Sequence, residues 1–269
     1  MPEAAAAVRD EVGGRAIVAV GGGRAIDSAK AIAGADGLRC AAIPTTLSGA
    51  EMTPFHRMPA GVDEWKLTRP EVVIAVPSLM ASQPMPDLAA SAMNALAHAI
   101  EALYAPGTNE VAQDAALRSA GLLAAGLDSE DPKRTELALG ALLAGYASGV
   151  AGFAIHHAVC QTIVRELGTP HAQTNAVMLP HFVRFMGPRA PEAIEKLGKA
   201  MNVGESPASV TARVSELASR AGVTRLGELD VGQEALDQVA DAAMQHPALG
   251  NTPDPPDASE LRAVLEAAL

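Results

Sequence analysis

The order of hydrophobic and polar positions divides the chain into two regions of different character. Up to residue 83, compact apolar runs of strand length at 15–20, 40–44 and 70–76 are separated by helix-forming or polar stretches. Short strands that alternate with a helix are typical of a parallel sheet. We therefore predict an α/β unit over residues 1–83, which begins with a short helix at 3–12.

After residue 79 the pattern becomes helical. Pro84, Pro86 and Asp87 form a typical helix start and mark the boundary of an all-helical second domain, residues 84–269. Helices are expected at 87–105, 109–127, 132–150, 152–167 and 171–186, the last with a kink at Pro180, and further amphipathic stretches follow. No internal repeat and no low-complexity tract interrupts this order.

One stretch, residues 137–155, runs without a charged residue and is long enough to span a bilayer. Four glycines interrupt it, the basic flanks of a membrane span are thin, and a block of histidines follows directly. We therefore expect a buried central helix and no membrane association.

Composition limits the environment and the partners. Hydrophobic residues make up 49% of the chain and aromatic residues only 3%, so we expect helices that pack closely through alanine. The net charge is −11 and the acidic excess falls after residue 70, which argues against nucleic acid and anionic membranes as partners. Two distant cysteines, Cys40 and Cys160, and a start unlike a signal peptide indicate the cytoplasm.

A glycine triplet, Gly21, Gly22 and Gly23, follows the first apolar run and precedes a helix. Strand, glycines and helix start together form a phosphate-binding arrangement, because the backbone can approach an anion and the first amides of the helix are free. A plain turn is the alternative, since the spaced glycine fingerprint of ordinary Rossmann folds is absent. Asp27 and Ser28 are expected to cap this helix.

Hydroxyl groups follow the second apolar run. Thr45, Thr46 and Ser48 come directly after Pro44, at the carboxyl end of the predicted strand. Hydroxyls in this position suit a pyrophosphate or a ribose. Together with the glycine triplet they predict a dinucleotide site.

Asn94 and His98 are four residues apart in an apolar helix, so they share one face, one turn apart. His157 lies on a later helix, and His171 follows Pro170 at a helix start. Three imidazoles and an amide oxygen could hold a transition metal, yet no anionic ligand is supplied. The alternative is that these are hydrogen-bonded histidines of the core or of a cleft.

The segments NALAHAIEALYAP (94–106) and HHAVCQTIVRELGTPHAQTNAVMLPH (156–181) resemble the two signature blocks of the iron-containing (group III) alcohol dehydrogenases, most of all the maleylacetate reductase branch. The resemblance implies a Rossmann-like sheet domain and a helical domain. It assigns His98, His157 and His171 to the three metal-binding histidines of the family. The fourth ligand position, an Asp in metal-dependent members, is Asn94, as in the reductase branch, so a divalent metal is doubtful.

The glycine and hydroxyl segments also resemble the loops with which this family holds the pyrophosphate and the nicotinamide side of NAD or NADP. Arg24 stands where the family usually has Ser. Gln161 stands where the family has a further His near the nicotinamide, and an amide cannot relay protons as an imidazole can.

The family is longer than this chain by about eighty residues at the front, where the adenosine half of the cofactor binds. The resemblance therefore implies a truncated sheet whose edge is covered by the N-terminal helix or by another subunit, and we expect a homodimer.

Two enzyme functions follow from these residues. The first is nicotinamide-dependent reduction of a small acidic carbonyl or enoyl compound, with catalytic residues His98, His157, His171, Asn94 and Gln161 and cofactor-binding residues Gly21, Gly22, Gly23, Thr45, Thr46 and Ser48. The second is non-redox acid–base chemistry, as in an isomerase, a cyclase or a lyase, in the same histidine cleft. An inactive paralogue that binds a ligand is a third, weaker alternative.

Overall fold

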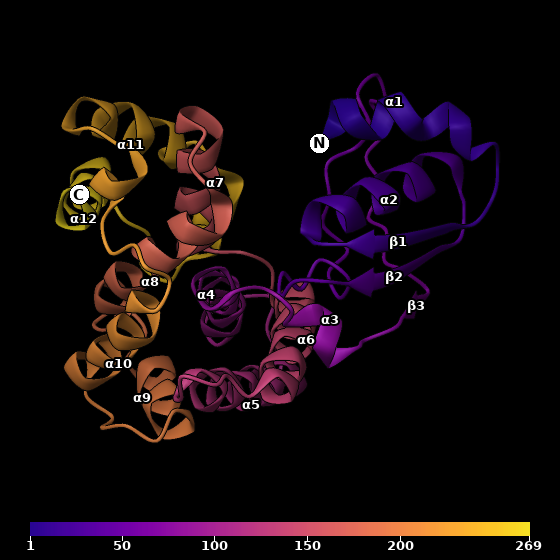
Figure 1. Cartoon of the computed structure of the whole chain (residues 1–269). Helices are drawn as coiled ribbons and strands as arrows, with labels where there is room; N and C mark the ends of the chain where they lie inside the picture. The colour runs from indigo at the N-terminus through magenta and orange to yellow at the C-terminus, as the bar shows by residue number, and fades with distance from the viewer.

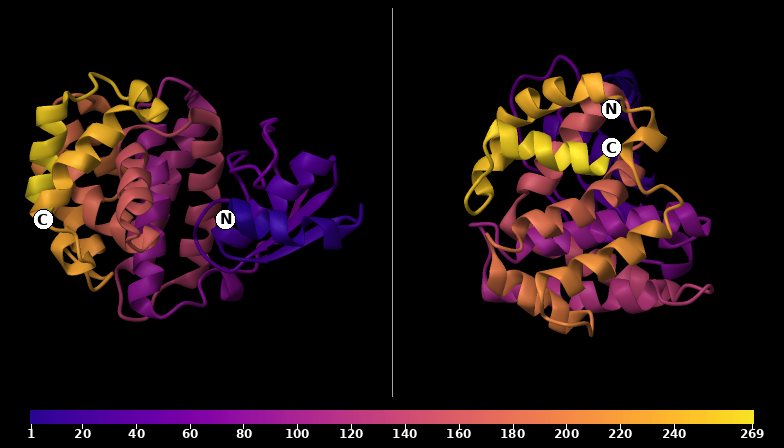
Figure 2. Two further views of the ribbon diagram at one scale, coloured as in Figure 1. Left: turned by 90° about the horizontal axis from the view of Figure 1, so that it is seen from above. Right: turned by 90° about the vertical axis from the view of Figure 1, so that its left-hand side faces the viewer.

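The chain folds as a small parallel sheet followed by a long series of helices, as the hydrophobic pattern predicts (Figure 1). The computed structural model describes all residues, 1–269. The predicted fold class, an α/β part followed by an all-helical part, is confirmed. The two parts lie side by side, with the N-terminal part beside the helical one (Figure 2).

The α/β part contains the following elements: α1 (Pro2–Val12), β1 (Ile17–Gly21), α2 (Gly23–Asp36), β2 (Cys40–Pro44) and β3 (Val72–Val73). The strands pair in the order β1-β2-β3, all parallel, with Ile17 opposite Cys40 and Ala41 opposite Val72. β3 is only two residues long, although an apolar run of seven residues predicted it. The segment between β2 and β3 has no regular structure, and its His56 and Met58 are buried.

The two faces of the sheet differ in their cover. Ala19, Cys40 and Ala42 face α2 and are buried against it. The opposite face presents aliphatic side chains that are half exposed or more: Val18 (61%), Val20 (62%), Val72 (49%) and Ile74 (48%). α1 packs on α2 through Ala5, so it lies on the covered side of the sheet and leaves the other face bare. What covers the edge of the sheet, the N-terminal helix or another subunit, stays a prediction.

The helical part consists of α3 (Pro77–Met80), α4 (Met85–Ala102), α5 (Glu110–Leu127), α6 (Arg134–Ala151), α7 (Ile155–Leu167), α8 (His171–Met186), α9 (Pro191–Ala200), α10 (Pro207–Ser219), η1 (Leu226–Leu229), η2 (Gln233–Ala235), α11 (Leu236–Met244), η3 (Pro247–Asn251) and α12 (Ala258–Ala268). Proline opens several of these helices, as its fixed φ favours, and α8 continues through Pro180.

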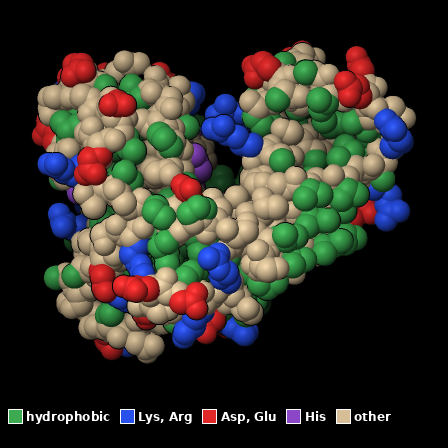
Figure 3. Space-filling model, in the orientation of Figure 1, with side chains coloured by type: hydrophobic (Ala, Val, Ile, Leu, Met, Phe, Trp, Pro, Cys, Tyr) green, Lys and Arg blue, Asp and Glu red, His purple; other side chains and the backbone are tan.

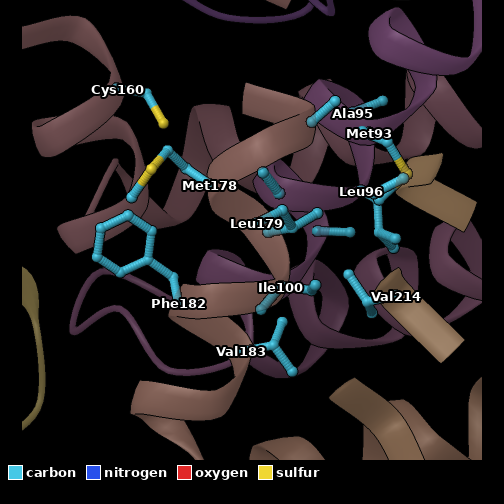
Figure 4. Close-up of a cluster of buried hydrophobic side chains, with 14 of the residues drawn as sticks. Met93, Ala95, Leu96, Ile100, Cys160, Met178, Leu179, Phe182, Val183 and Val214 are labelled. Atoms are coloured by element: carbon cyan, nitrogen blue, oxygen red, sulfur yellow. The ribbon is translucent and has the colours of Figure 1, made fainter. Parts of the chain in front are cut away.

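α4 is the central helix of this part (Figure 1). Every residue from Leu88 to Ala102 is buried, because α5, α6, α7, α8 and α10 surround the helix. A helix that is apolar on all sides is stable only inside a protein, and its many alanines let the neighbours approach closely. Side chains of α4, α7, α8 and α10 fill the core beside it, among them Met93, Leu96, Met178, Leu179 and Val214 (Figure 4).

No single helix combines the length and the apolar character that crossing a membrane requires. Only α6 and α7 taken together have such a composition, and they are bent by 99° relative to each other. The apolar stretch 137–155 therefore ends α6 and begins α7, which agrees with the separate helices predicted at 132–150 and 152–167.

The joint between the two parts is built from backbone in direct contact. A Cβ atom added at Gly145 of α6 would lie 2.9 Å from the carbonyl oxygen of Gly49 and 3.0 Å from its Cα. Gly49 adopts φ +71°, a conformation that favours glycine. Next to it, Leu47 is fully buried in the helical core, and its amide donates to Ser91 Oγ at 3.0 Å. The loop after β2 therefore packs into the helical part.

A buried lysine holds the same loop from the other side. Lys30 of α2 is fully buried, and its ammonium donates to Asp27 Oδ1 and to the carbonyls of Ala50 and Phe55 at 2.7–2.8 Å. Asp27 and Ser28 do not cap α2 as we expected, because the helix already starts at Gly23: Asp27 binds Lys30, and Ser28 donates to a carbonyl within the helix. Nearby, burial raises the pKa of Glu51 to about 7.

The predicted domain limits, 1–83 and 84–269, stay a prediction. Leu47 and Met80 precede the boundary and yet belong to the helical core.

Replacing Gly145 by Ala tests the joint. The added methyl group meets backbone that cannot rotate away, so the free energy of unfolding should fall by about 1–3 kcal/mol despite the better helix propensity of Ala. Urea denaturation measures the change. Gly250→Ala is the matched control, because nothing lies within 4 Å of its added Cβ. Equal stability of the two variants would contradict the close contact.

Candidate active site

The α4 side of the site carries three polar residues on one helix face. Asn94, His98 and Glu101 are spaced by four and three residues, so they lie one above the other along α4. Asn94 and His98 are each 5% exposed and Glu101 is 1% exposed, within a helix that is otherwise almost entirely apolar. Polar groups buried this deeply require partners or a ligand.

The partner of this face is the start of α7. α6 ends at Ala151, Gly152 turns the chain with φ +87°, and α7 begins at Ile155. This turn places His157 against His98: the two imidazole rings stack with centroids 4.4 Å apart and planes 15° apart. Phe153, from the turn itself, stacks on His157 at 4.6 Å and extends the layer.

Glu101 binds His157 twice. Its Oε2 lies 2.6 Å from His157 Nδ1, and its Oε1 accepts the backbone N–H of His157 at 3.2 Å. Burial lowers the pKa of His157 to about 3 and the pKa of His98 well below its ordinary value, so both rings are neutral in the free protein. His157 Nε2 and Asn94 Oδ1 are buried and have no partner.

His171 begins α8, as predicted, and is exposed at the edge of the site. The surrounding protein lowers its pKa, and the positive charge of Arg24 on α2 lowers it further. Asn175, one turn along α8, donates to the His171 carbonyl at 2.7 Å and approaches its Nε2 at 3.4 Å. The amide oxygen of Asn175 accepts from His156 at 2.8 Å, so His156 supports His171 from the core.

The hydroxyl loop, Thr45–Ser48, connects the glycine triplet to the histidines. A Cβ at Gly23 would lie 3.1 Å from Ser48 Oγ, and a Cβ at Gly22 would lie 3.0 Å from Thr46 Cγ2. The next residue, Gly49, lies against the ring of His98, whose Nδ1 is 3.4 Å from where a Cβ of Gly49 would stand. The structure thus connects the glycine turn, the hydroxyl loop and the stacked histidines in one continuous series of contacts.

This end of the sheet fits a phosphate. α2 starts at Gly23 after Gly22, and no side chain caps its free amides. Thr45 donates its backbone N–H to Gly21, which holds the two loops together. Thr46 Oγ1 is buried without a partner, as expected of a hydroxyl that awaits a ligand.

The same residues do not fit a divalent metal. A histidine lone pair lies in the ring plane, and a bound ion stands about 2.0–2.1 Å from the nitrogen. The rings of His98 and His157 are stacked in nearly parallel planes 4.4 Å apart, so their lone pairs do not converge on one point. Asn94 supplies an amide in place of a carboxylate, and no group of three His, Cys, Asp or Glu side chains has a geometry suited to an ion.

The remaining predicted residue, Gln161, lies one turn after His157 on α7 and is half buried. The sequence reasoning missed Glu101 and Phe153. Glu101 had a detectable signal, because it continues the helix face of Asn94 and His98 three residues on. Phe153 had none, since it is an apolar residue at the start of the helix predicted at 152–167, and the structure places it in the turn before α7.

Figure 3 shows a hollow between the two parts of the molecule, with a histidine on the helical wall and a basic side chain that projects toward it from the α/β part. The hollow is open to solvent. A separate cavity of about 330 Å³ between α8 and α12, next to Arg189 and Glu260, lies apart from these residues.

Comparison with known proteins places both parts of the chain. Residues 88–269 match the model of the Fe-containing alcohol dehydrogenase family, C-terminal, and residues 2–53 match that of iron-containing alcohol dehydrogenase. Maleylacetate reductase 1 of Rhodococcus opacus is 40% identical over 243 residues, which cover 86% of this chain and 67% of that protein. Maleylacetate reductase of Sphingobium indicum is 35% identical over 258 residues, 91% of this chain and 72% of its own length.

Solved structures resemble nearly the whole chain. The maleylacetate reductase of Agrobacterium tumefaciens superimposes with a TM-score of 0.85 at 32% identity and covers 99% of this chain and 77% of its own. A putative alcohol dehydrogenase of Ralstonia eutropha gives a TM-score of 0.88 at 35% identity, over 98% and 77% of the two chains.

Removal of metal tests the histidine geometry. Because the stacked rings offer no common coordination point, the purified protein should hold far less than one transition-metal ion per chain, and dialysis against EDTA should leave Tm unchanged within about 1 °C. Elemental analysis and thermal unfolding provide the measurements. One equivalent of iron or zinc, with a Tm that falls on chelation, would contradict this geometry.

Proposed function

This chain belongs to the iron-containing alcohol dehydrogenase family, a family of oxidoreductases, and we propose that it is a nicotinamide-dependent reductase of a small acidic carbonyl or enoyl compound. The observation that carries the proposal is the contact between Gly49 and His98. It joins a phosphate-binding turn to a pair of buried imidazoles, which is the arrangement that reduction next to a dinucleotide requires.

The proposed cofactor site uses the glycine triplet and the hydroxyl loop. Gly21, Gly22 and Gly23 and the first amides of α2 bind the pyrophosphate of NAD or NADP, and Thr45, Thr46 and Ser48 donate hydroxyls to it or to the adjoining ribose. A bound nicotinamide supplies the hydride for the carbon that is reduced. Ser48 lies against Gly23 and Gly49 lies against His98, so the residues that would hold the cofactor adjoin the histidines.

The histidines exchange a proton with the substrate oxygen. Reduction of a carbonyl adds one hydride to carbon and one proton to oxygen, and the oxygen carries negative charge on the way. His157 Nε2 is buried and unpartnered, so it is free to exchange the proton with that oxygen. Asn94 and His98 bind and orient the substrate, and the stacked Phe153 excludes water from the rings.

The acidic class of the substrate rests on local charge. With a net charge of −11 the protein repels anions as a whole, so an acidic compound needs a positive group in the cleft. Arg24 meets this need, because its charge acts on His171 and it has no ion-pair partner of its own. We propose that Arg24 and His171 receive a carboxylate of the substrate, as in a compound of the maleylacetate type.

A non-redox enzyme is the second candidate. The buried Glu101–His157 pair favours it, because a carboxylate that orients an imidazole suffices for isomerisation or elimination without a cofactor. We regard an inactive ligand-binding paralogue as weaker than either, since the unpartnered polar atoms of the cleft imply a ligand on which the histidines act.

Cofactor titration separates these candidates. NADH or NADPH should bind with a Kd below about 1 mM, measured by calorimetry, because helix amides and hydroxyls together bind the pyrophosphate. NADH oxidation should depend on an added keto dicarboxylate such as maleylacetate. His157→Ala should lower kcat by about a hundredfold or more, since general acid–base help is lost.

His181→Ala is the matched control for this experiment, because His181 borders the separate cavity between α8 and α12. The activity of this variant should equal that of the wild type. A folded protein that binds neither nucleotide would move the assignment to the non-redox enzyme. Full activity of His157→Ala would refute both enzyme proposals.

We also propose a cytoplasmic homodimer whose subunits cover the bare face of the sheet. Parallel sheets are almost always covered on both faces, and Val18, Val20, Val72 and Ile74 are not covered within one chain. Both cysteines are free and buried, which suits a reducing compartment.

Light scattering at micromolar concentration should give twice the chain mass of 27.5 kDa. Val20→Asp should shift the mass toward one chain, because it places a charge in the apolar interface. Val111→Asp changes an equally exposed valine, 63% against 62%, on α5 and should leave the dimer intact. A wild-type protein of single-chain mass would refute the dimer.

A further inference from the structure

Glu101 is the one fully buried carboxylate that faces a histidine of the site. It belongs to α4, whereas both groups that it binds belong to residue 157 of α7, so the contact crosses between helices that are distant in sequence. With 1% exposure and a side chain between two apolar helices, it is a costly group to bury. Such a cost requires a compensating role.

One role is visible at the start of α7. Ala154 precedes the helix and cannot cap it, so the first backbone N–H groups of α7 need an acceptor from elsewhere. Glu101 Oε1 provides it by accepting the N–H of His157 at 3.2 Å. This contact uses one oxygen of the carboxylate, and a neutral amide oxygen could serve as well.

The second oxygen determines the state of the ring. Oε2 of Glu101 lies 2.6 Å from His157 Nδ1. Burial raises the pKa of Glu101, and the backbone N–H groups at the start of α7 oppose this shift because they favour the ionised form. An ionised carboxylate is an acceptor only, so it requires the hydrogen on Nδ1. In a neutral imidazole the lone pair then resides on Nε2, the atom left buried and unpartnered beside His98 and Phe153. An amide in place of Glu101 could not enforce this arrangement.

We propose that Glu101 is a positioning residue for the reaction: it fixes the His157 ring with its proton on Nδ1 and presents Nε2 as the proton-exchanging atom. This inference rests on the proposed reductase function. In the alcohol-oxidising direction, Nε2 of the neutral His157 ring takes the proton of the alcohol, so an N–H bond forms as the O–H bond breaks, and a bound nicotinamide would accept the hydride that leaves the carbon; reduction is the reverse of this step. Glu101 stabilises the imidazolium that forms, and water takes the proton from it afterwards.

Glu101→Gln separates positioning from capping. The Gln oxygen can still accept the N–H of His157, which preserves the start of α7. Its NH₂ group, however, would face Nδ1 and turn it into an acceptor, which moves the ring proton to Nε2. The hydrogen bond from the backbone N–H of His157 is thus kept, while Nε2 carries a hydrogen and can no longer accept a proton.

Steady-state kinetics should show a fall in kcat of about a hundredfold or more in Glu101→Gln, with KM for the acidic substrate and Kd for NADH changed less than about threefold. Glu166→Gln is the matched control, since it makes the same substitution on the surface of α7 and contacts no histidine ring; its kcat should equal wild type. A loss of folding alone would change KM, Kd and Tm together.

Nitrogen-15 NMR of histidine-labelled protein gives a second readout that needs no activity. The His157 signals, identified by their loss in His157→Gln, should show a protonated Nδ1 and a bare Nε2 in the wild type, and the reverse in Glu101→Gln. This result would support the positioning role even if nicotinamide binding failed, in which case the reductase assignment alone would fall.

Two outcomes overturn the proposal. The first is a wild-type His157 that carries its proton on Nε2, which is decided without any variant. The second is an active wild type whose Glu101→Gln form keeps its kcat; the reductase assignment would then stand and Glu101 would be a helix cap only.

Discussion

The arrangement of the whole molecule depends on the backbone contact between the loop after β2 and α6. Gly49 and Gly145 touch where any side chain would keep them apart, and Lys30 holds the loop from the side of the sheet. Because Leu47 of the same loop is buried among the helices, the sheet and the helical part are fixed through one short segment. The distance between the glycine turn, Gly21–Gly23, and His98 follows from this contact.

Burial then determines the chemistry of the histidines. α4 lies at the centre of the helical part, so the polar residues on it leave water almost completely, and burial lowers the pKa of His98 and His157. Neutral rings exchange protons with a substrate only when a nearby group selects the exchanging nitrogen and offsets the charge of the imidazolium. Glu101, one turn from His98 on the same helix, is in position to do both.

Much of this could be predicted from the sequence, because local patterns determine it. The strand–glycine–helix order, the common face of Asn94 and His98, and the start of α8 at His171 follow from periodicity and from proline. Tertiary packing determines the rest. The sharp turn at Gly152 brings Phe153 onto His157, and the parallel stacking of His98 on His157 depends on side-chain rotamers that no spacing encodes. The same stacking argues against a metal site, which the spacing of the histidines alone had left open.

If the glycine turn and the stacked histidines share one cleft, a nucleotide bound at the turn must alter the histidine rings, and histidine-selective NMR during addition of NADH detects this. The ring signals of His98 and His157 should shift with the nucleotide concentration, while those of His181, which borders the cavity between α8 and α12, stay in place. Binding of NADH that leaves the His98 and His157 signals unmoved would show that the nucleotide lies elsewhere and that the two groups do not form one site.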